Sequence, residues 1–281
     1  MPEKKNNHYI PKSILKYWVT KNEKNKKGVY VFDLKKNKSY FSEPFGRRAF
    51  SFAIENDIYV PVIEGKRRLE LEEWFAGLEN TLAITVKKIE SDTNSTLFKS
   101  KKEMDKFILA LFSFKHRTKY VVKNIEKYLK NNPKYLKLIT GKKDNSSEVI
   151  LLENIVNAIN HDAIKLSRFE MIIMKSKENS FIYGDLPFLE NIIDGYNFMP
   201  LTNKILIAFR STKEKSFYKK YECENKMVES INFAIASNSE NWIVADNLNQ
   251  IIKYQSELKT KTDDETVYVP FNFALNGNYF K

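Results

Sequence analysis

The chain has 281 residues, of which 42% are hydrophobic and 29% are charged, and with only 8 Gly and 8 Pro it is not a disordered, collagen-like or low-complexity protein. The single cysteine, Cys223, excludes a disulfide framework or a cysteine-based zinc cluster and is typical of a reducing compartment. No apolar stretch approaches the roughly 20 residues that span a bilayer, and the N-terminus lacks the apolar run of a signal peptide, so we expect a cytoplasmic protein without a membrane segment.

The N-terminal part of the chain is predicted to form a short helix followed by strands. The segment HYIPKSILKYW (8–18) is extended as far as Pro11, after which Ile14, Leu15 and Trp18 share one side of a helix. The strands that follow are expected at 28–34, at 39–44 and at the end of 50–63.

Helices are predicted to dominate the next hundred residues. Apolar side chains recur with the 3.6-residue period of an amphipathic helix. Ser100 and Glu103 form the pattern of a capping box, and the helix that they start has a break near Arg117 and a stop at Pro133. The three expected helical ranges are 69–89, 101–131 and 148–166.

From Phe169 onward, the pattern changes to short strands with helices between them. The order of the elements predicts an α+β fold, in which a central helical segment (roughly 69–166) packs against a mixed sheet. No repeat and no Pro/Gly/Ser-rich linker divides the chain, so we expect a single domain, 1–281, with N-terminal strands at 28–63 and a mixed strand and helix part at 169–281. The expected C-terminal strands are 169–176, 180–185, 204–210, 241–246 and 265–273, and the expected helices are 222–238 and 247–258.

The net charge of +12 is concentrated in two segments. Residues 1–40 hold 11 Lys and 3 acidic residues, and residues 115–145 hold 10 Lys or Arg and 2 acidic residues, so the rest of the chain is mildly acidic. Such clustering favours contact with nucleic acid or another anionic surface. Only 7 of the 47 basic residues are Arg, and abundant Lys, Asn and Ile are also typical of a genome of low GC content, so both interpretations stay open.

Several catalytic motifs are absent from the sequence. It contains no GxxxxGK[ST], GxGxxG, HExxH, GxSxG or CxxC pattern. Triplets of the [Asp/Glu]-x-Lys type, which occur in restriction-type nucleases, are present at 64–66, 224–226 and 257–259, but none follows an Asp on a convincing strand. The sequence therefore offers no common catalytic signature.

A set of collinear landmarks is more specific. The segment at 8–18 resembles the opening of a bacterial family known as domain of unknown function 4238, whose members begin with a pattern similar to H-Y-[VI]-P-x-x-x-L-x-x-[FW]. The chain departs from the family at Gly184, where a hydroxyl residue is usual before Asp185, and it lacks a Gln upstream of Arg117. The other segments that resemble the family are Leu78–Glu79, FILALFSFKHRT (107–118), FIYGDLPF (181–188), MPLTN (199–203) and Asn232.

The resemblance implies landmarks rather than a mechanism, so the roles below follow from residue type. His8 is a candidate general base or metal ligand, or a histidine bonded to backbone. Asp185 is a candidate metal ligand or base at a strand end, or the acceptor of an Asx turn. Arg117 is a candidate clamp for a phosphate, or the partner of a buried acid such as Glu79 or Asp185. Glu79 is expected to be that partner or a metal ligand.

Residues around these candidates are expected to support them. Tyr9 is expected to pack in the fold, and Asn232 to hydrogen-bond backbone inside it. Lysines recur at three- and four-residue steps after Arg117, with Tyr120 among them, and this pattern fits a helix face that follows a phosphate backbone and stacks bases. A solvated helix face is the alternative interpretation. The lysines of this face are Lys119, Lys123, Lys127 and Lys130.

The function expected from these residues is a nuclease-like, metal-assisted phosphodiester hydrolase, in the setting of a phage-defence or mobile-element effector. His8 and Asp185, with Glu79, would bind Mg²⁺ or Mn²⁺ or activate water, and Arg117 would steady the phosphate. The alternative is a non-catalytic module that binds nucleic acid or protein, in which the same His, Arg and Asp form a structural polar network. The sequence leaves the substrate and the oligomeric state open.

Overall fold

The chain groups into two compact units, which we describe separately. The computed structural model describes residues 6–8, 10–44, 50–56, 58, 60, 62–63, 66–67, 69–91, 97–131, 147–166, 169–193, 196–210 and 218–258. The helical unit contains residues 1–9, 54–165 and 269–281, and the sheet unit contains residues 10–53 and 166–268. Both units are assembled from segments that are far apart in the sequence, so the helical unit interrupts the sheet unit along the chain.

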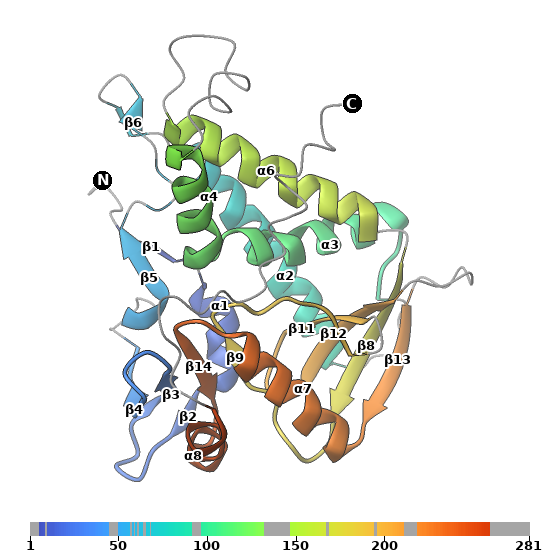
Figure 1. Ribbon diagram of the computed structural model, residues 1–281. Coiled ribbons are helices and arrows are strands. Elements are labelled where there is room, and N and C mark those ends of the chain that lie inside the picture. The colour runs from blue at the N-terminus through green and yellow to red at the C-terminus, as the bar shows by residue number, and fades with distance from the viewer. Residues whose placement is uncertain are drawn as a thin grey trace. The chain divides into compact units, whose positions relative to one another are not determined.

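The sheet unit contains a mixed sheet with the strand order β10-β11-β12-β8-β13 (Figure 1). The first four strands run antiparallel to their neighbours, whereas β13 runs parallel to β8. Every position of β8 except Lys175 is buried, and its four consecutive apolar residues, 171–174, are typical of a strand that is covered on both faces. The strands are β8 (Glu170–Ser176), β10 (Leu189–Ile193), β11 (Tyr196–Pro200), β12 (Ile205–Arg210) and β13 (Tyr218–Cys223).

A second, antiparallel sheet of the same unit has the order β2-β3-β14-β9, with β4 also paired to β3. The hairpin of β3 and β4 turns at Asn37, which has a positive φ of 48°. Strand β14 lies between β3 and β9, so it joins segments from the two ends of the chain. The strands are β2 (Thr20–Lys21), β3 (Lys27–Asp33), β4 (Lys38–Ser42), β9 (Tyr183–Gly184) and β14 (Trp242–Ala245).

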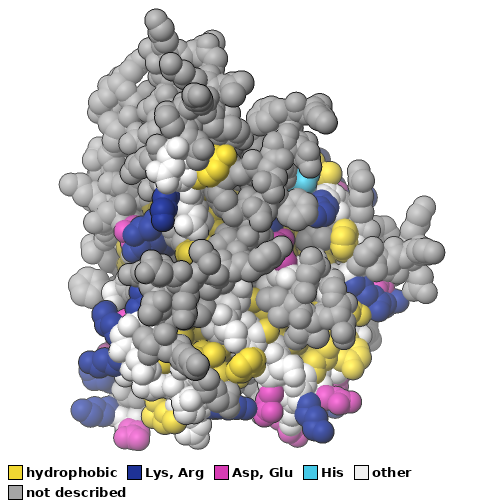
Figure 2. All heavy atoms as spheres, in the orientation of Figure 1, with side chains coloured by type: hydrophobic (Ala, Val, Ile, Leu, Met, Phe, Trp, Pro, Cys, Tyr) yellow, Lys and Arg dark blue, Asp and Glu magenta, His cyan; other side chains and the backbone are white. Residues whose placement is uncertain are grey.

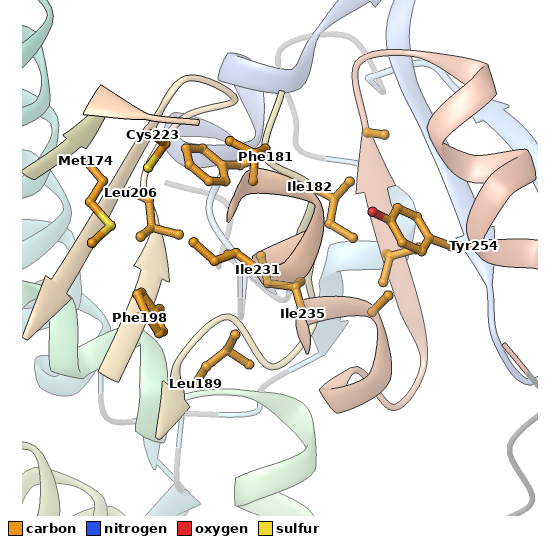
Figure 3. Close-up of a cluster of buried hydrophobic side chains, with 14 of the residues drawn as sticks. Met174, Phe181, Ile182, Leu189, Phe198, Leu206, Cys223, Ile231, Ile235 and Tyr254 are labelled. Atoms are coloured by element: carbon orange, nitrogen blue, oxygen red, sulfur yellow. The ribbon is translucent and has the colours of Figure 1, made fainter. Parts of the chain in front are cut away.

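The core of the sheet unit forms around one helix, α7 (Asn225–Asn238). Figure 3 shows Ile231 and Ile235 of this helix between Met174 and Leu206 of the mixed sheet on one side and Ile182 on the other. A second helix, α8 (Leu248–Glu257), contributes Ile251 and Tyr254 to the same core. The remaining helical turns of this unit are α1 (Lys12–Leu15), η1 (Lys16–Trp18) and η2 (Ser51–Ala53).

The helical unit is built from four described helices, and local sequence signals explain their ends. Ser100 caps α3, because its side chain accepts a hydrogen bond from the Glu103 backbone N–H, as the capping-box pattern predicts. The chain leaves helical geometry at Arg117 and Thr118, and the Thr118 hydroxyl then accepts a hydrogen bond from the N–H of Val121. The helices are α2 (Glu70–Glu90), α3 (Lys101–His116), α4 (Lys119–Asn131) and α6 (Ser147–Leu166).

Two short antiparallel ribbons complete the described part of the helical unit. Strand β1 (Asn6–His8) pairs with β5 (Ile54–Asn56), and β6 (Val62–Ile63) pairs with β7 (Lys66–Arg67). The landmark segment at 8–18 is therefore divided: His8 belongs to the helical unit, whereas residues 10–18 belong to the sheet unit.

The predicted α+β fold is confirmed, and so are the expected helices and most of the expected strands. In the mixed sheet, strands lie where none was predicted at β10, β11 and β13, and residues 199–200 of the expected loop MPLTN belong to β11. Single-domain organisation stays a prediction. The expected strand at 265–273 lies outside the described residues. Among the described helices, none is both long and apolar enough to cross a bilayer.

Candidate functional site

Asp185 lies directly after β9 in the sheet unit, and its carboxylate holds a neighbouring loop. Its Oδ1 accepts a hydrogen bond from the Glu240 N–H (2.9 Å), and its Oδ2 accepts from the backbone (3.1 Å) and side-chain (2.6 Å) N–H groups of Asn241. Burial raises the pKa of the Asp185 carboxyl above its usual value, although the hydrogen bonds from Asn241 and Glu240 act in the opposite direction. Both oxygens are thus engaged in joining the end of β9 to the loop before β14.

Gly184, the residue before Asp185, lies where this chain has no room for a side chain. A Cβ atom at this position would lie 2.0 Å from the Ser239 Oγ and 3.3 Å from the Ile235 Cγ2. The Ser239 hydroxyl is buried and donates a hydrogen bond to the Ile235 carbonyl oxygen at the end of α7. In this chain the hydroxyl of Ser239 therefore occupies the space that a side chain at position 184 would need.

Replacing Gly184 with Ala is expected to lower the free energy of unfolding by about 1–3 kcal/mol, the cost of forcing an extra group into a packed interior. The loss should be smaller when Ser239→Ala is introduced at the same time, because that change removes the hydroxyl that blocks the site. Urea unfolding of the four proteins in this cycle measures both effects. If Gly184→Ala costs the same stability with and without Ser239→Ala, the steric explanation is wrong.

The side chain of Asn232 in α7 makes hydrogen bonds to the backbone of the segment before β9, as a neighbouring strand would. Its Oδ1 accepts a hydrogen bond from the Ile182 N–H (3.0 Å), and its Nδ2 donates to the Ser180 carbonyl oxygen (2.8 Å). The side chain is buried. The prediction that Asn232 would hydrogen-bond backbone inside the fold is therefore confirmed, and these bonds fix the path of the chain into the FIYGDLPF segment.

Arg117 and Glu79 are the two predicted site residues that the structure brings together. Arg117 lies between α3 and α4, and its guanidinium donates to the Glu79 Oε1 of α2 (2.6 Å). The guanidinium also lies over the rings of Phe75 (5.0 Å) and Phe114 (4.5 Å). The Arg117 side chain is only 1% exposed, whereas that of Glu79 is 26% exposed. The predicted pairing of Arg117 with an acid is confirmed for Glu79.

A charged cluster that the sequence did not predict lies in the same unit. Lys115 and His116, at the end of α3, both reach the Asp162 Oδ2 of α6, at 2.6 Å from Nζ and 2.8 Å from Nε2. All three side chains are nearly buried. The only sequence signal was that the polar run Lys115–Thr118 directly follows the largely apolar stretch 107–114, because buried charge is costly unless it is paired.

The electrostatic balance of the cluster favours an ionised Asp162. Burial by itself would raise the pKa of Asp162, but the hydrogen bond from His116 and the positive charge of Lys115 lower it well below its usual range. The cluster and the Arg117–Glu79 pair together connect α3 to α2 and α6. The buried charged side chains of the helical unit therefore link α3 to α2 and to α6.

Three of the four lysines of the predicted basic face have described side chains on α4. Val121, Val122 and Ile125 are buried on one side of this helix, whereas Lys123 and Lys127 are exposed. Lys119 lies on the same side as these lysines and forms an ion pair with Glu55 of β5. Figure 2 shows basic side chains over α4 and β5, with an acidic side chain beside them. Tyr120 is half-buried, and the side chain of Lys130 and residues 132–146 lie outside the described part.

The described lysines of the basic N-terminal segment are distributed along several elements of the sheet unit. They lie mainly in the turns at the two ends of β3. Lys26 pairs with Glu43, and Lys36 pairs with Asp33, so part of this charge is neutralised locally. Of the two basic segments, the one at 115–145 therefore has the clearer exposed face.

The remaining candidates are placed as follows. His8 pairs with Ile54 through the β1–β5 ribbon, its side chain is not among those described, and Tyr9 lies outside the described residues. Burial raises the pKa of the Cys223 thiol to about 11, so little reactive thiolate forms at neutral pH. In the described ranges, no three His, Cys, Asp or Glu side chains are grouped as a metal site. The metal roles of Asp185 and Glu79 stay predictions.

Comparison with known proteins gives a family but no activity. No match was found among curated proteins or among solved structures. A family model described as "Protein of unknown function (DUF4238)" matches residues 6–248, which is most of the chain and includes every landmark from His8 to Asn232. The chain therefore belongs to the DUF4238 family.

Proposed function

We propose that this protein binds nucleic acid through the exposed lysine face of α4, and that the polar side chains of its family landmarks have structural roles within each unit. The observation that carries the proposal is the pair Lys123 and Lys127, one helical turn apart and opposite the buried side of α4. Within the described part of the chain, neither forms an ion pair, so both are available to a polyanion. Phosphate contacts of this kind supply sequence-independent affinity.

Three observations support the structural part of the proposal. Asp185 accepts hydrogen bonds on both carboxylate oxygens, Asn232 bonds to backbone on both sides of its amide, and Arg117 is paired with Glu79. Buried polar groups that are hydrogen-bonded or ion-paired in this way stabilise the folded state. The hydrogen bonds of Asp185 and Asn232 thus give these two residues a structural role that needs no reacting substrate.

Neutralising the two lysines with Lys123→Gln and Lys127→Gln is expected to weaken binding of labelled single-stranded RNA or DNA by about tenfold at low salt. The slope of log K against log salt should fall by roughly 1.4, because about 0.7 is lost for each contact to a single strand. Fluorescence anisotropy measures both quantities.

The matched control is Lys102→Gln with Lys106→Gln on α3. These two lysines are also exposed and four residues apart, so this variant has the same net charge and the same spacing of substitutions. It should bind nearly as well as the natural protein. Equal losses in the two variants would reduce the effect to net charge and contradict the proposed face.

The same samples test the predicted hydrolase. Cleavage that needs Mg²⁺ or Mn²⁺ and disappears in His8→Ala, with folding intact, would favour the metal-assisted enzyme over the binding module. Binding without cleavage would favour the module. If no nucleic acid binds at any salt concentration, the proposed function is wrong.

A further inference from the structure

Lys119 differs from Lys123 and Lys127 because, among the described residues of the α4 face, it has an anionic partner. Its Nζ donates to the Glu55 carboxylate. The two side chains are 31% and 35% exposed, so the contact lies at the surface and not inside the unit. Lys123 and Lys127, on the same side of the helix, are exposed by comparison.

Glu55 is held in place by backbone pairing. It lies in β5, where it is opposite Asn7 of β1, and both of its neighbours, Ile54 and Asn56, also have partners in this ribbon. The carboxylate therefore extends from an anchored strand toward the first turn of α4. It presents to Lys119 the same kind of charge that a phosphodiester would present.

We propose that Glu55 withholds Lys119 from nucleic acid and thereby limits the affinity of the α4 face for a phosphodiester backbone. This inference rests on the proposed function. A carboxylate and a phosphate oxygen compete for the same ammonium group, and a partly exposed ion pair is weak enough for its loss to leave the fold intact. Glu55 is thus an intramolecular competitor of the ligand.

Removing the competitor with Glu55→Gln is expected to tighten binding of a single-stranded oligonucleotide. The released lysine adds one phosphate contact, so the slope of log K against log salt should become steeper by about 0.7. Across a change from about 50 to about 200 mM salt, the advantage of the variant over the natural protein should shrink by about 2.5-fold. Anisotropy titrations at both salt concentrations measure this advantage.

A double-mutant cycle separates withholding from a general effect of charge. If Glu55 holds Lys119 back, Lys119→Gln should cost at least about threefold more affinity in the Glu55→Gln background than in the natural protein. If Glu55 acts only through its long-range field, Lys119→Gln should cost the same factor in both backgrounds, and the proposal is overturned. Glu43→Gln, which breaks the exposed Lys26–Glu43 pair, is the control for losing one negative charge elsewhere.

The outcomes also separate this inference from the proposed function. If the natural protein and all variants fail to bind nucleic acid, the proposed function fails. If the natural protein binds through Lys123 and Lys127 but Glu55→Gln leaves affinity and salt slope unchanged, only the role of Glu55 is refuted. Thermal melting of each variant checks that the β1–β5 ribbon and α4 remain folded.

Discussion

Replacing Asp185 with Ala is expected to lower the free energy of unfolding by about 3–5 kcal/mol. The change leaves the N–H groups of Glu240 and Asn241 without their acceptor, and each buried donor left unpaired costs about 1–3 kcal/mol. The side-chain amide of Asn241 loses its acceptor as well. Urea unfolding gives the total loss, and amide hydrogen exchange at residues 240–242 gives its location.

Two comparisons make the Asp185 result specific. Asp185→Asn retains one carbonyl oxygen as an acceptor and should lose markedly less stability than Asp185→Ala. Asp33→Ala is the control in the same unit, because Asp33 accepts an exposed hydrogen bond from the Lys36 N–H and should cost less than about 1 kcal/mol. If Asp185→Ala unfolds like the natural protein, the carboxylate is not structural, and its interpretation as a catalytic group gains support.

Asp162→Ala is expected to cost a similar amount, about 3–5 kcal/mol, in the helical unit. The substitution removes the carboxylate that the nearly buried Lys115 and His116 share, and breaking a buried ion pair from one side is strongly destabilising. Asp105→Ala, which removes an exposed partner of Lys101 on α3, is the matched control and should cost less than about 1 kcal/mol. Urea unfolding gives the stability lost in Asp162→Ala and in Asp105→Ala, and hydrogen exchange in α3 and α6 shows where it is lost.

The contribution of Asp162 should also depend on pH in a defined direction. Because its pKa is lowered in the folded state, the stabilisation is fully present above the unfolded value of about 3.9 and is lost as the pH falls toward the folded pKa. The stability that the natural protein has over Asp162→Asn should therefore shrink as the pH falls below about 4. A difference that grows as the solution is acidified would contradict the assigned direction.

Local signals explain which parts of the fold could be predicted. The capping box of Ser100 and Glu103, the break at Arg117 and the end of α4 before Pro133 depend on residues within one or two helical turns. Each was therefore readable from a short stretch of sequence. Strand β11 was missed because its sequence YNFMP has no clear alternation and ends in a proline, and because its stability comes from pairing with β12.

Partners that are distant in the sequence limited the prediction of the site. Arg117 was expected to pair with Glu79 or Asp185, and residue type alone did not distinguish the two. Asp162 was not considered, although its carboxylate contacts both Lys115 and His116. To predict which acidic residue pairs with a given basic residue, one must know which helix faces are in contact. Neither the charges nor the hydrophobic period of the sequence gives that information. In the same way, the lysine face of α4 was predicted from its spacing, but its contact with Glu55 was not.

The position of β14 between β3 and β9 has a consequence for synthesis on the ribosome. Val31 of β3 pairs with Val244, so the central strand of that sheet is made roughly 210 residues after its neighbour. At translation rates of about 5–20 residues per second, β3 waits on the order of 10–40 seconds for this partner, while all the described helices of the helical unit have already emerged. The nascent chain thus carries an incomplete apolar hairpin, with one edge of β3 lacking its native partner, through most of its translation.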